Sequence, residues 1–337
     1  MKQENKLLPG SLFCLLIGAA AWVMANYIPT VGKLIGGPVF AILLGMILAF
    51  WKRPSAMDAG ITFCSKKILQ YSIIFIGFGM NIRTVLATGG QSLAVMLCTI
   101  AASLLTAFLM GRVLKVPGNT ATLIGVGTSI CGGSAIAATA PVIEADDREV
   151  AYSISTIFLF NILAVFIFPA LGRVFHMTDT GFGIWAGTAI NDTSSVVAAG
   201  FTFSDAAGEL ATIVKLTRTL MIIPITLALT VHRTWKRKQQ GTAAASNYSI
   251  VKIFPWFVLG FLLTAILNST GWIPSAASSW LNELGKFGIM VAMAGIGLNT
   301  NLKSLVKNGV RPIALGLCCW FVVAVVSLVV QHLLHLV

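Results

Sequence analysis

Long apolar runs follow one another along nearly the whole chain, and short polar segments separate them. A helix of about 20 apolar residues crosses the roughly 30 Å hydrocarbon core of a bilayer, so each run predicts a transmembrane helix. Eleven spans are expected, at about 8–27, 33–51, 67–85, 91–114, 121–143, 149–175, 181–203, 206–232, 250–272, 284–302 and 311–336. The pattern therefore predicts an all-α integral membrane protein.

Two of these spans contain a polar, glycine-rich stretch in the middle. Gly127–Ala138 reads GTSICGGSAIAA and Gly187–Gly200 reads GTAINDTSSVVAAG, and the two stretches align without a gap at an offset of 60 residues. Unwound backbone at membrane depth is tolerated only where protein or a hydrated cavity satisfies its N–H and C=O groups. Paired interrupted helices are typical of the substrate site of a secondary transporter, so we expect discontinuous helices and a binding site here.

A second internal repeat joins distant parts of the chain. Gly77-Phe-Gly-Met-Asn81 in the third span matches Gly295-Ile-Gly-Leu-Asn299 in the tenth. An odd number of crossings separates these two segments, so they are expected to run in opposite directions, which is the arrangement of an inverted repeat. The two polar stretches are an even number of crossings apart, so they are expected to run parallel.

The polar stretches supply the candidate substrate-binding residues. A helix that restarts after a break offers free N–H groups and the positive end of its dipole to an anion, and nearby hydroxyl groups add donors. The candidates are Asn191, Asp192, Thr193, Ser194 and Ser195 in the second stretch, and Ser129, Cys131, Gly132, Gly133 and Ser134 in the first. The alternative is that these small residues only allow tight helix packing.

Lys215 and Arg218 are two cations inside the eighth span. Counted from Glu209 at the end of that span, they lie about 9 and 13 Å deep, and their i, i+3 spacing places them on one helix face. Asp192 is the only obvious intramembrane counter-charge, so the two cations leave a positive excess that an anionic substrate would relieve. The structural alternative is an internal salt bridge from Asp192 to either cation.

Four further residues, together with Asp192, are candidates for coupling to H⁺ or Na⁺. Glu149 and Glu209 occupy matching positions of the 60-residue repeat, each at the start of the span that follows an interrupted one. A helix-capping role is the alternative for both. Asn81 and Asn299 end the matched Gly-x-Gly stretches, and they either line the centre of the protein or cap a helix end.

Composition sets the protein class. The chain is 57% hydrophobic and only 10% charged, which excludes a soluble globular protein of this length. The net charge of +12 comes mainly from loops, so it reports topology and no nucleic-acid partner is expected.

The basic residues predict a cytoplasmic N-terminus and a C-terminus outside, because most Lys and Arg then lie inside. The outside set is small and consists of Lys33, Arg83, Arg148 and Lys286, whereas Arg173 falls inside. The turns Glu144–Asp147 and Asp205–Glu209 would both face outward.

The basic loop after the eighth span divides the chain. We expect residues 1–232 to form an N-terminal transmembrane bundle with both polar stretches and 233–249 to form a basic cytoplasmic linker. Residues 250–337 are then the C-terminal transmembrane helices, and all parts belong to a single functional membrane domain.

The stretches GTSICGGSAIAATAP, EADDREVAYSIS, GTAINDTSSVVAAG and GxGLNTNLKSL resemble the YeiH-type family of bacterial sulfate exporters, and the similarity covers nearly the whole chain. The resemblance implies an inner-membrane protein distantly related to the bile-acid/arsenite/riboflavin transporter group, with a panel domain and a core domain that contains two crossing discontinuous helices. It also implies export of sulfate or small organosulfonate-derived anions. The expected parallel relation departs from that inverted pair, so either the span count hides a re-entrant segment or another span is the crossing partner.

We therefore expect a secondary transporter in the bilayer, an exporter of a small anion that alternates access around a midplane site. No cofactor or metal is expected, a homo-oligomer is compatible, and the chain has no Walker A sequence for ATP drive. An anion channel is the nearest alternative. Another is an intramembrane hydrolase with Ser194 as nucleophile and Lys215 as base, although no G-x-S-x-G or H-E-x-x-H motif supports it.

Overall fold

The computed structural model describes residues 4–28, 36–51, 53–222, 224–225, 228–229, 255–300 and 309–336. Within these ranges the chain forms helices and no strand, which confirms the all-α membrane fold. Six helical segments are long and apolar enough to cross a bilayer: Leu7–Tyr27, Ser55–Gly79, Ile82–Val113, Asp147–Val174, Ser275–Asn299 and Val310–Leu333. The expected linker at 233–249 lies outside the described residues.

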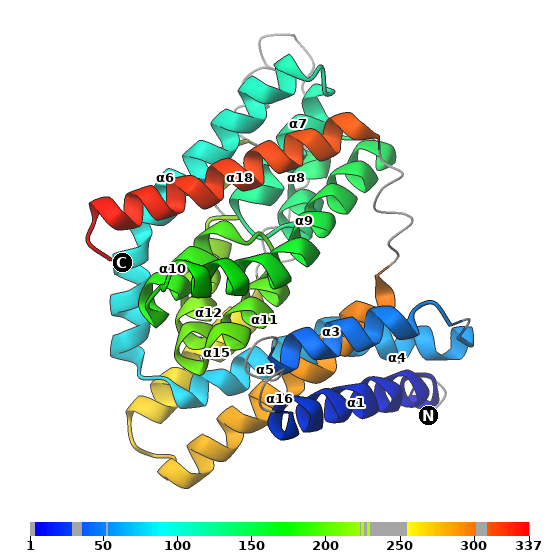
Figure 1. The fold of residues 1–337 in the computed structure, drawn as a ribbon, viewed down its shortest axis with the longest axis vertical. Coiled ribbons are helices and arrows are strands. Elements are labelled where there is room, and N and C mark those ends of the chain that lie inside the picture. The colour runs from blue at the N-terminus through cyan, green and yellow to red at the C-terminus, as the bar shows by residue number, and fades with distance from the viewer. Residues whose placement is uncertain are drawn as a thin grey trace.

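The helices form two bundles, and Figure 1 shows the first, the α16 bundle, in its lower part. This bundle contains α1 (Glu4–Tyr27), α3 (Gly37–Leu48), α15 (Trp256–Ser269), α16 (Ser275–Asn299) and one composite crossing. The composite crossing consists of η1 (Ser55–Met57), α4 (Asp58–Phe63), the π-helical turn η2 (Cys64–Ile68), α5 (Leu69–Ile76) and η3 (Gly77–Gly79).

The second bundle, which we call the hairpin bundle, contains both interrupted helices. Its elements are α6 (Ile82–Val113), α7 (Gly118–Ser129), α8 (Gly133–Ile143), α9 (Asp147–Val174), α10 (Asp179–Ala189), α11 (Thr193–Phe203), α12 (Asp205–Thr219) and α18 (Val310–Leu333). The breaks fall at 130–132 and 190–192, inside the two predicted polar stretches. The prediction of discontinuous helices is therefore confirmed.

The first interrupted helix folds back on itself. The amide of Asn119, at the start of α7, donates to Glu149 Oε2, at the start of α9, over 3.1 Å. The hydroxyl of Ser153 on α9 likewise lies within 3.5 Å of the carbonyl oxygen of Thr120. Because α8 ends only a few residues before Glu149, α8 returns to the end of the bundle from which α7 began. Residues 118–143 thus form a re-entrant hairpin.

The second interrupted helix does the same. The hydroxyl of Ser204, after α11, donates to Asp179 Oδ1 at the start of α10 over 2.5 Å. The rings of Phe182 and Phe203 stack with their centroids 4.0 Å apart. In a helix that continued straight, these two residues would be separated by about 30 Å. Residues 179–203 therefore form a second hairpin.

These hairpins correct two sequence predictions. The predicted spans 121–143 and 181–203 are hairpins and not crossings, so the count of eleven crossings is too high. Only α9 crosses between the hairpins, so they enter the protein from opposite ends and are inverted, not parallel. Hydropathy could not distinguish these cases, because two half-length apolar helices have the same total length as one crossing helix.

The two ends of the molecule are named after Arg53 and Asp205. Arg53 donates to Asn299 Oδ1 at the end of α16, and Lys286, nearer its start, pairs with Asp205. The second hairpin opens at the Asp205 end and the first at the Arg53 end. The Glu144–Asp147 turn therefore lies opposite the Asp205–Glu209 turn, which corrects the expectation that both face one side.

The same correction moves two arginines to the opposite ends of the molecule from those expected. Arg148, at the start of α9, lies at the Arg53 end, and Arg173, at the end of α9, lies at the Asp205 end. Each is opposite to its expected side, because the first hairpin is not a crossing.

The α16 bundle contains the predicted inverted repeat. Near the start of α16, Asn282 donates its amide to the carbonyl oxygen of Ile76 at the end of α5, so these helices run antiparallel. The Cβ position of Gly45 on α3 lies 3.0 Å from Gly297 Cα, and that of Gly77 lies within 3 Å of Thr264 on α15. Glycine at these contacts lets the backbones approach closely.

Candidate functional site

The tips of the two hairpins meet at one lysine of α12. Lys215 Nζ donates to the carbonyl oxygen of Ile130 over 2.7 Å and to that of Ile190 over 3.0 Å. Ile130 and Ile190 are matching residues of the 60-residue repeat, so one buried cation holds equivalent points of both hairpins. The two hairpins, which are the two copies of the 60-residue repeat, are therefore both bonded to α12 at their tips.

Arg218, one turn further along α12, binds the same two helix ends. Its Nε donates to Ser129 O and its Nη2 to Thr128 O, each over 2.7 Å, and its Nη1 donates to the carbonyl oxygen of Thr188. Both cationic side chains are fully buried. The last carbonyl groups of a helix lack intrahelical donors and carry the negative end of its dipole, so the cations stabilise the ends of α7 and α10.

Two interpretations of Lys215 and Arg218 were open from the sequence: direct attraction of an anionic substrate, or a salt bridge to Asp192. No ion pair of the described residues joins either cation to Asp192. Their donors point to backbone carbonyl groups, and neither side chain is among the residues that line the cavity described below. They stand behind the hairpin tips as positioning residues.

Gly132 makes the first tip possible. Its φ of 69° and ψ of −126° form a conformation that an L side chain rarely adopts. A Cβ built at this position would lie 3.7 Å from Asp192 Cβ and 3.7 Å from Asn161 Nδ2. The backbone of the first tip therefore approaches the second tip closely, next to a buried asparagine of α9.

Asp192 begins α11 and is only partly buried. Its Oδ2 accepts from the backbone N–H of Ser194 over 3.0 Å and also from the Ser194 hydroxyl, which makes it the N-cap of α11. Its own N–H donates to Asn161 Oδ1 over 3.3 Å. The carboxylate is thus held at a helix N-terminus, where its charge is favoured.

A cavity of about 490 Å³ lies beside the starts of α8 and α11. Ser134 and Cys131 line it from the first hairpin, and Asp192 and Thr193 line it from the second. The rest of the wall comes from Ala137 and Ala138 of α8, Thr219 and Ile222 at the end of α12, and Gln70, Pro255 and Phe257 of the α16 bundle. The cavity therefore lies between the two bundles, on the Arg53 side of the hairpin tips.

Other predicted site residues stand near this cavity without lining it. Ser194 and Ser195 are buried in the first turn of α11, and Ser129 donates its hydroxyl to the carbonyl oxygen of Val126. Gly133 has no atom within 4 Å of its Cβ position. Asn191 is fully buried, and neither of its amide atoms has a hydrogen-bond partner among the described residues.

The four further coupling candidates lie at the ends of the bundles and away from this cavity. Glu149 forms a capping box with Asp146 at the start of α9. Asn81 caps α6 by accepting from the N–H of Arg83 over 2.9 Å. Asn299 accepts from Arg53, and Glu209 faces Asn282 of the α16 bundle at 3.5 Å. Of the five candidates, only Asp192 lines the cavity.

Several residues that line or support the cavity are not predicted from the sequence. Gln70 and Phe257 come from helices far along the chain and belong to no motif, so only the packing of the two bundles reveals them. Asn161 is 3% exposed in the middle of an apolar helix, and this isolated buried amide was a signal that could have found it.

The geometry does not bring together the pair required by the hydrolase alternative. The Ser194 hydroxyl donates to Asp192, and the Lys215 ammonium donates to two backbone carbonyl groups. A nucleophile and its base need a mutual hydrogen bond, and the described contacts contain none between Ser194 and Lys215.

Comparison with known proteins places the chain among bacterial membrane proteins. A family model described as conserved hypothetical protein 698 matches residues 9–316. A UPF0324 membrane protein of Streptococcus mutans is 50% identical over 99% of both chains, one of Fusobacterium nucleatum is 44% identical over 98% of this chain and 99% of its own, and one of Streptococcus pyogenes is 49% identical over 98% of both. The protein therefore belongs to the UPF0324 family of membrane proteins.

Proposed function

We propose that this protein is a secondary transporter that exports a small anion such as sulfate or a related sulfonate. The observation that carries the proposal is the cavity beside the hairpin tips, where the N-terminal ends of α8 and α11 meet. The N-terminal end of α8, which has no side-chain cap, offers N–H groups and the positive end of its dipole to an anion, and the hydroxyls of Ser134 and Thr193 add donors. The sequence resemblance to YeiH-type sulfate exporters supports the same substrate class.

The charges around the tips favour an anion. Lys215 and Arg218 contribute two positive charges and Asp192 contributes one negative charge, so the centre carries a positive excess. The hydrogen bonds of the two cations to carbonyl groups do not cancel their charge. In a low-dielectric interior this excess attracts an anion into the cavity, while the cations themselves hold the hairpins in place.

Alternating access follows from the two inverted hairpins. A pseudo-twofold arrangement gives one chain two forms of similar energy, each open at one end. We propose that the hairpin bundle moves against the α16 bundle around the tips. Coupling to H⁺ or Na⁺ would use Asp192, the only carboxylate among the described residues that line the cavity.

We place the protein in the bacterial inner membrane with its N-terminus in the cytoplasm. In this orientation Arg148 joins the inside set and Arg173 joins the outside set, so the excess of inside Lys and Arg is unchanged. The cavity on the Arg53 side then opens to the cytoplasm, which is the side from which an exporter collects its substrate.

The test is anion binding by the purified protein, with a matched pair of cavity variants. Ala137 is exposed, lines the cavity and has no polar contact to lose. Ala137→Asp places a negative charge in the cavity, whereas Ala137→Asn has nearly the same shape without the charge. Sulfate, sulfite, thiosulfate, taurine and chloride are compared by thermal stabilisation, and a bound anion adds about 2.7 kcal/mol at a hundredfold excess over its Kd.

The proposal predicts that at least one anion stabilises the wild-type protein and Ala137→Asn but not Ala137→Asp. Two outcomes contradict it: no anion stabilises the wild type, or Ala137→Asp binds as well as Ala137→Asn.

A further inference from the structure

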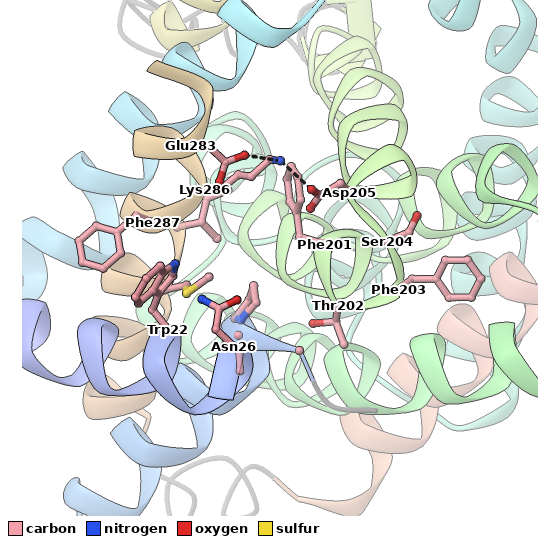
Figure 2. Close-up of a pocket in the computed structure, with 16 residues that line it drawn as sticks. Trp22, Asn26, Phe201, Thr202, Phe203, Ser204, Asp205, Glu283, Lys286 and Phe287 are labelled. Carbon is pink, nitrogen blue, oxygen red and sulfur yellow. Dashed lines mark hydrogen bonds and ion pairs between the residues drawn. The ribbon is translucent and has the colours of Figure 1, made fainter. Parts of the chain in front are cut away.

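A second cavity lies between the same two bundles at the Asp205 end. It has a volume of about 410 Å³, and Figure 2 shows Trp22 and Asn26 of α1 and Phe287 of α16 on one side of it. Phe201 and Asp205 from the hairpin bundle face them from the other side. The protein thus has one cavity on each side of the hairpin tips, both along the same interface.

The two bundles are held together beside the second cavity by two polar contacts. Lys286 Nζ of α16 pairs with Asp205 Oδ2 of α12 at 2.7 Å, as the dashed line in Figure 2 shows. Asn282 Nδ2 of α16 lies 3.5 Å from Glu209 Oε1 of α12. Asn282 and Lys286 are four residues apart on α16, and Asp205 and Glu209 are four residues apart on α12. One face of each helix therefore carries both contacts. We call these four residues the clasp.

A short barrier separates the two cavities. Thr193 at the start of α11 lines the first cavity, and Phe201 near its end lines the second. These two residues are eight positions apart, which is about 12 Å along a helix, so this is the length of the barrier. Between them, Val197 and Ala198 are fully buried in the hydrophobic core of the α16 bundle.

We infer that the second cavity is the other mouth of the transport path and that the clasp keeps this mouth separated from the hairpin tips in the present form. The inference rests on the proposed function, because a transport path needs an opening on each side of the membrane. Opening requires α12 to separate from α16, which breaks both clasp contacts and exposes the α11 face that carries Val197 and Ala198. In the form described here the first cavity reaches the hairpin tips from the Arg53 side, and the barrier separates the second cavity from them.

The clasp is weak enough to open during a transport cycle. The Asp205 side chain is 70% exposed, so water screens its ion pair with Lys286. Removal of such a pair shifts an equilibrium by about 2- to 5-fold.

The experiment measures access to the barrier and does not require transport. Ala198→Cys in the full-length protein, in vesicles, is treated from the Asp205 side with a membrane-impermeant maleimide, and the chain without this cysteine gives the background from native thiols such as the exposed Cys98. When Lys286→Met is added to Ala198→Cys, the rate at which the introduced cysteine is labelled is expected to rise about 2- to 5-fold over that of Ala198→Cys alone.

Glu283→Gln is the matched control. Glu283 pairs with Lys286 within α16 and does not join the bundles, so its loss leaves the contact with Asp205. A rise in Lys286→Met that is absent in Glu283→Gln supports the clasp. An unchanged rate in Lys286→Met, or an equal rise in both variants, overturns it. If the rate rises as expected but no anion is bound or carried, the clasp stands and the proposed function fails.

Discussion

The two hairpins share a sequence pattern but differ at their tips. In both, the carbonyl group of a matching isoleucine, Ile130 or Ile190, accepts from Lys215. The next two residues are Cys131 and Gly132 in the first hairpin, but Asn191 and Asp192 in the second. The shared positions build the frame, and the differing positions give each tip its own chemistry.

The difference divides two roles between the hairpins. Gly132 has no side chain to cap α8, so the N–H groups of Gly133 and Ser134 are left for a ligand, whereas that of Ala135 is bonded to the Cys131 side chain. Asp192 caps α11 with its own carboxylate and brings a negative charge to the cavity. Under the proposed function, the first hairpin would bind the anion and the second would take part in coupling to a proton or a cation.

The largest expected effect concerns the direction of the two hairpins. Arg148→Cys follows the first hairpin and Ala206→Cys follows the second, and both positions are exposed. Because the hairpins enter from opposite ends, a membrane-impermeant maleimide should label the two cysteines from opposite sides of the membrane. Labelling of both cysteines from one side would show that the hairpins run parallel and would contradict the inverted arrangement.

The next effect is the loss of the cation that binds both helix ends. Arg218→Ala leaves three buried carbonyl groups without a donor, so we expect a loss of about 3–5 kcal/mol in the free energy of unfolding. Thermal unfolding in detergent measures this loss, with Arg148→Ala at an exposed position as the control. Equal melting temperatures for the two variants would show that Arg218 does not hold the tips.

A smaller effect is expected from the backbone of the first tip. Gly132→Ala forces a side chain into a left-handed conformation, which costs about 1–3 kcal/mol. Gly133→Ala is the control, because its Cβ position is open and its φ is not positive. Thermal unfolding should rank Gly132→Ala clearly below Gly133→Ala, and the reverse order would contradict the described tip.

The smallest expected change in stability comes from Asp192→Asn. Asparagine is about as good an N-cap as aspartate, so the free energy of unfolding should change by less than about 0.5 kcal/mol. The charge is lost, however, so transport should no longer respond to an imposed proton or sodium gradient. A response equal to that of the wild type would remove Asp192 from coupling.

The position of each break is predictable from the sequence, but its direction is not. Glycine, threonine and serine inside apolar runs predict one break within 127–138 and one within 187–200, because such polar stretches are unsuited to a lipid-facing helix. The return of α8 and α11 depends on tertiary contacts such as that of Asn119 with Glu149. Hydropathy depends only on the local sequence, so it does not report contacts between residues far apart in the chain.

The candidate site was predictable in its residue types but not in its assignments. Asp192 and Ser134 line the cavity as expected, whereas Lys215 and Arg218 bind carbonyl groups behind it. The sequence indicates that each buried cation needs a partner. The partners here are backbone carbonyl groups, which every residue carries, so the sequence does not identify which residues supply them. Gln70 lines the cavity only because the α16 bundle packs there.

The most direct test of the account is counterflow in proteoliposomes. Radiolabelled sulfate, thiosulfate and taurine are offered outside vesicles that contain the same unlabelled anion, for the wild-type protein and for the Ala137→Asp and Ala137→Asn variants. We predict saturable uptake of at least one anion that the internal anion accelerates, with uptake kept in Ala137→Asn and lost in Ala137→Asp. Uptake no greater than in protein-free vesicles for every anion, or flux that never saturates and is equal in all three proteins, would contradict it.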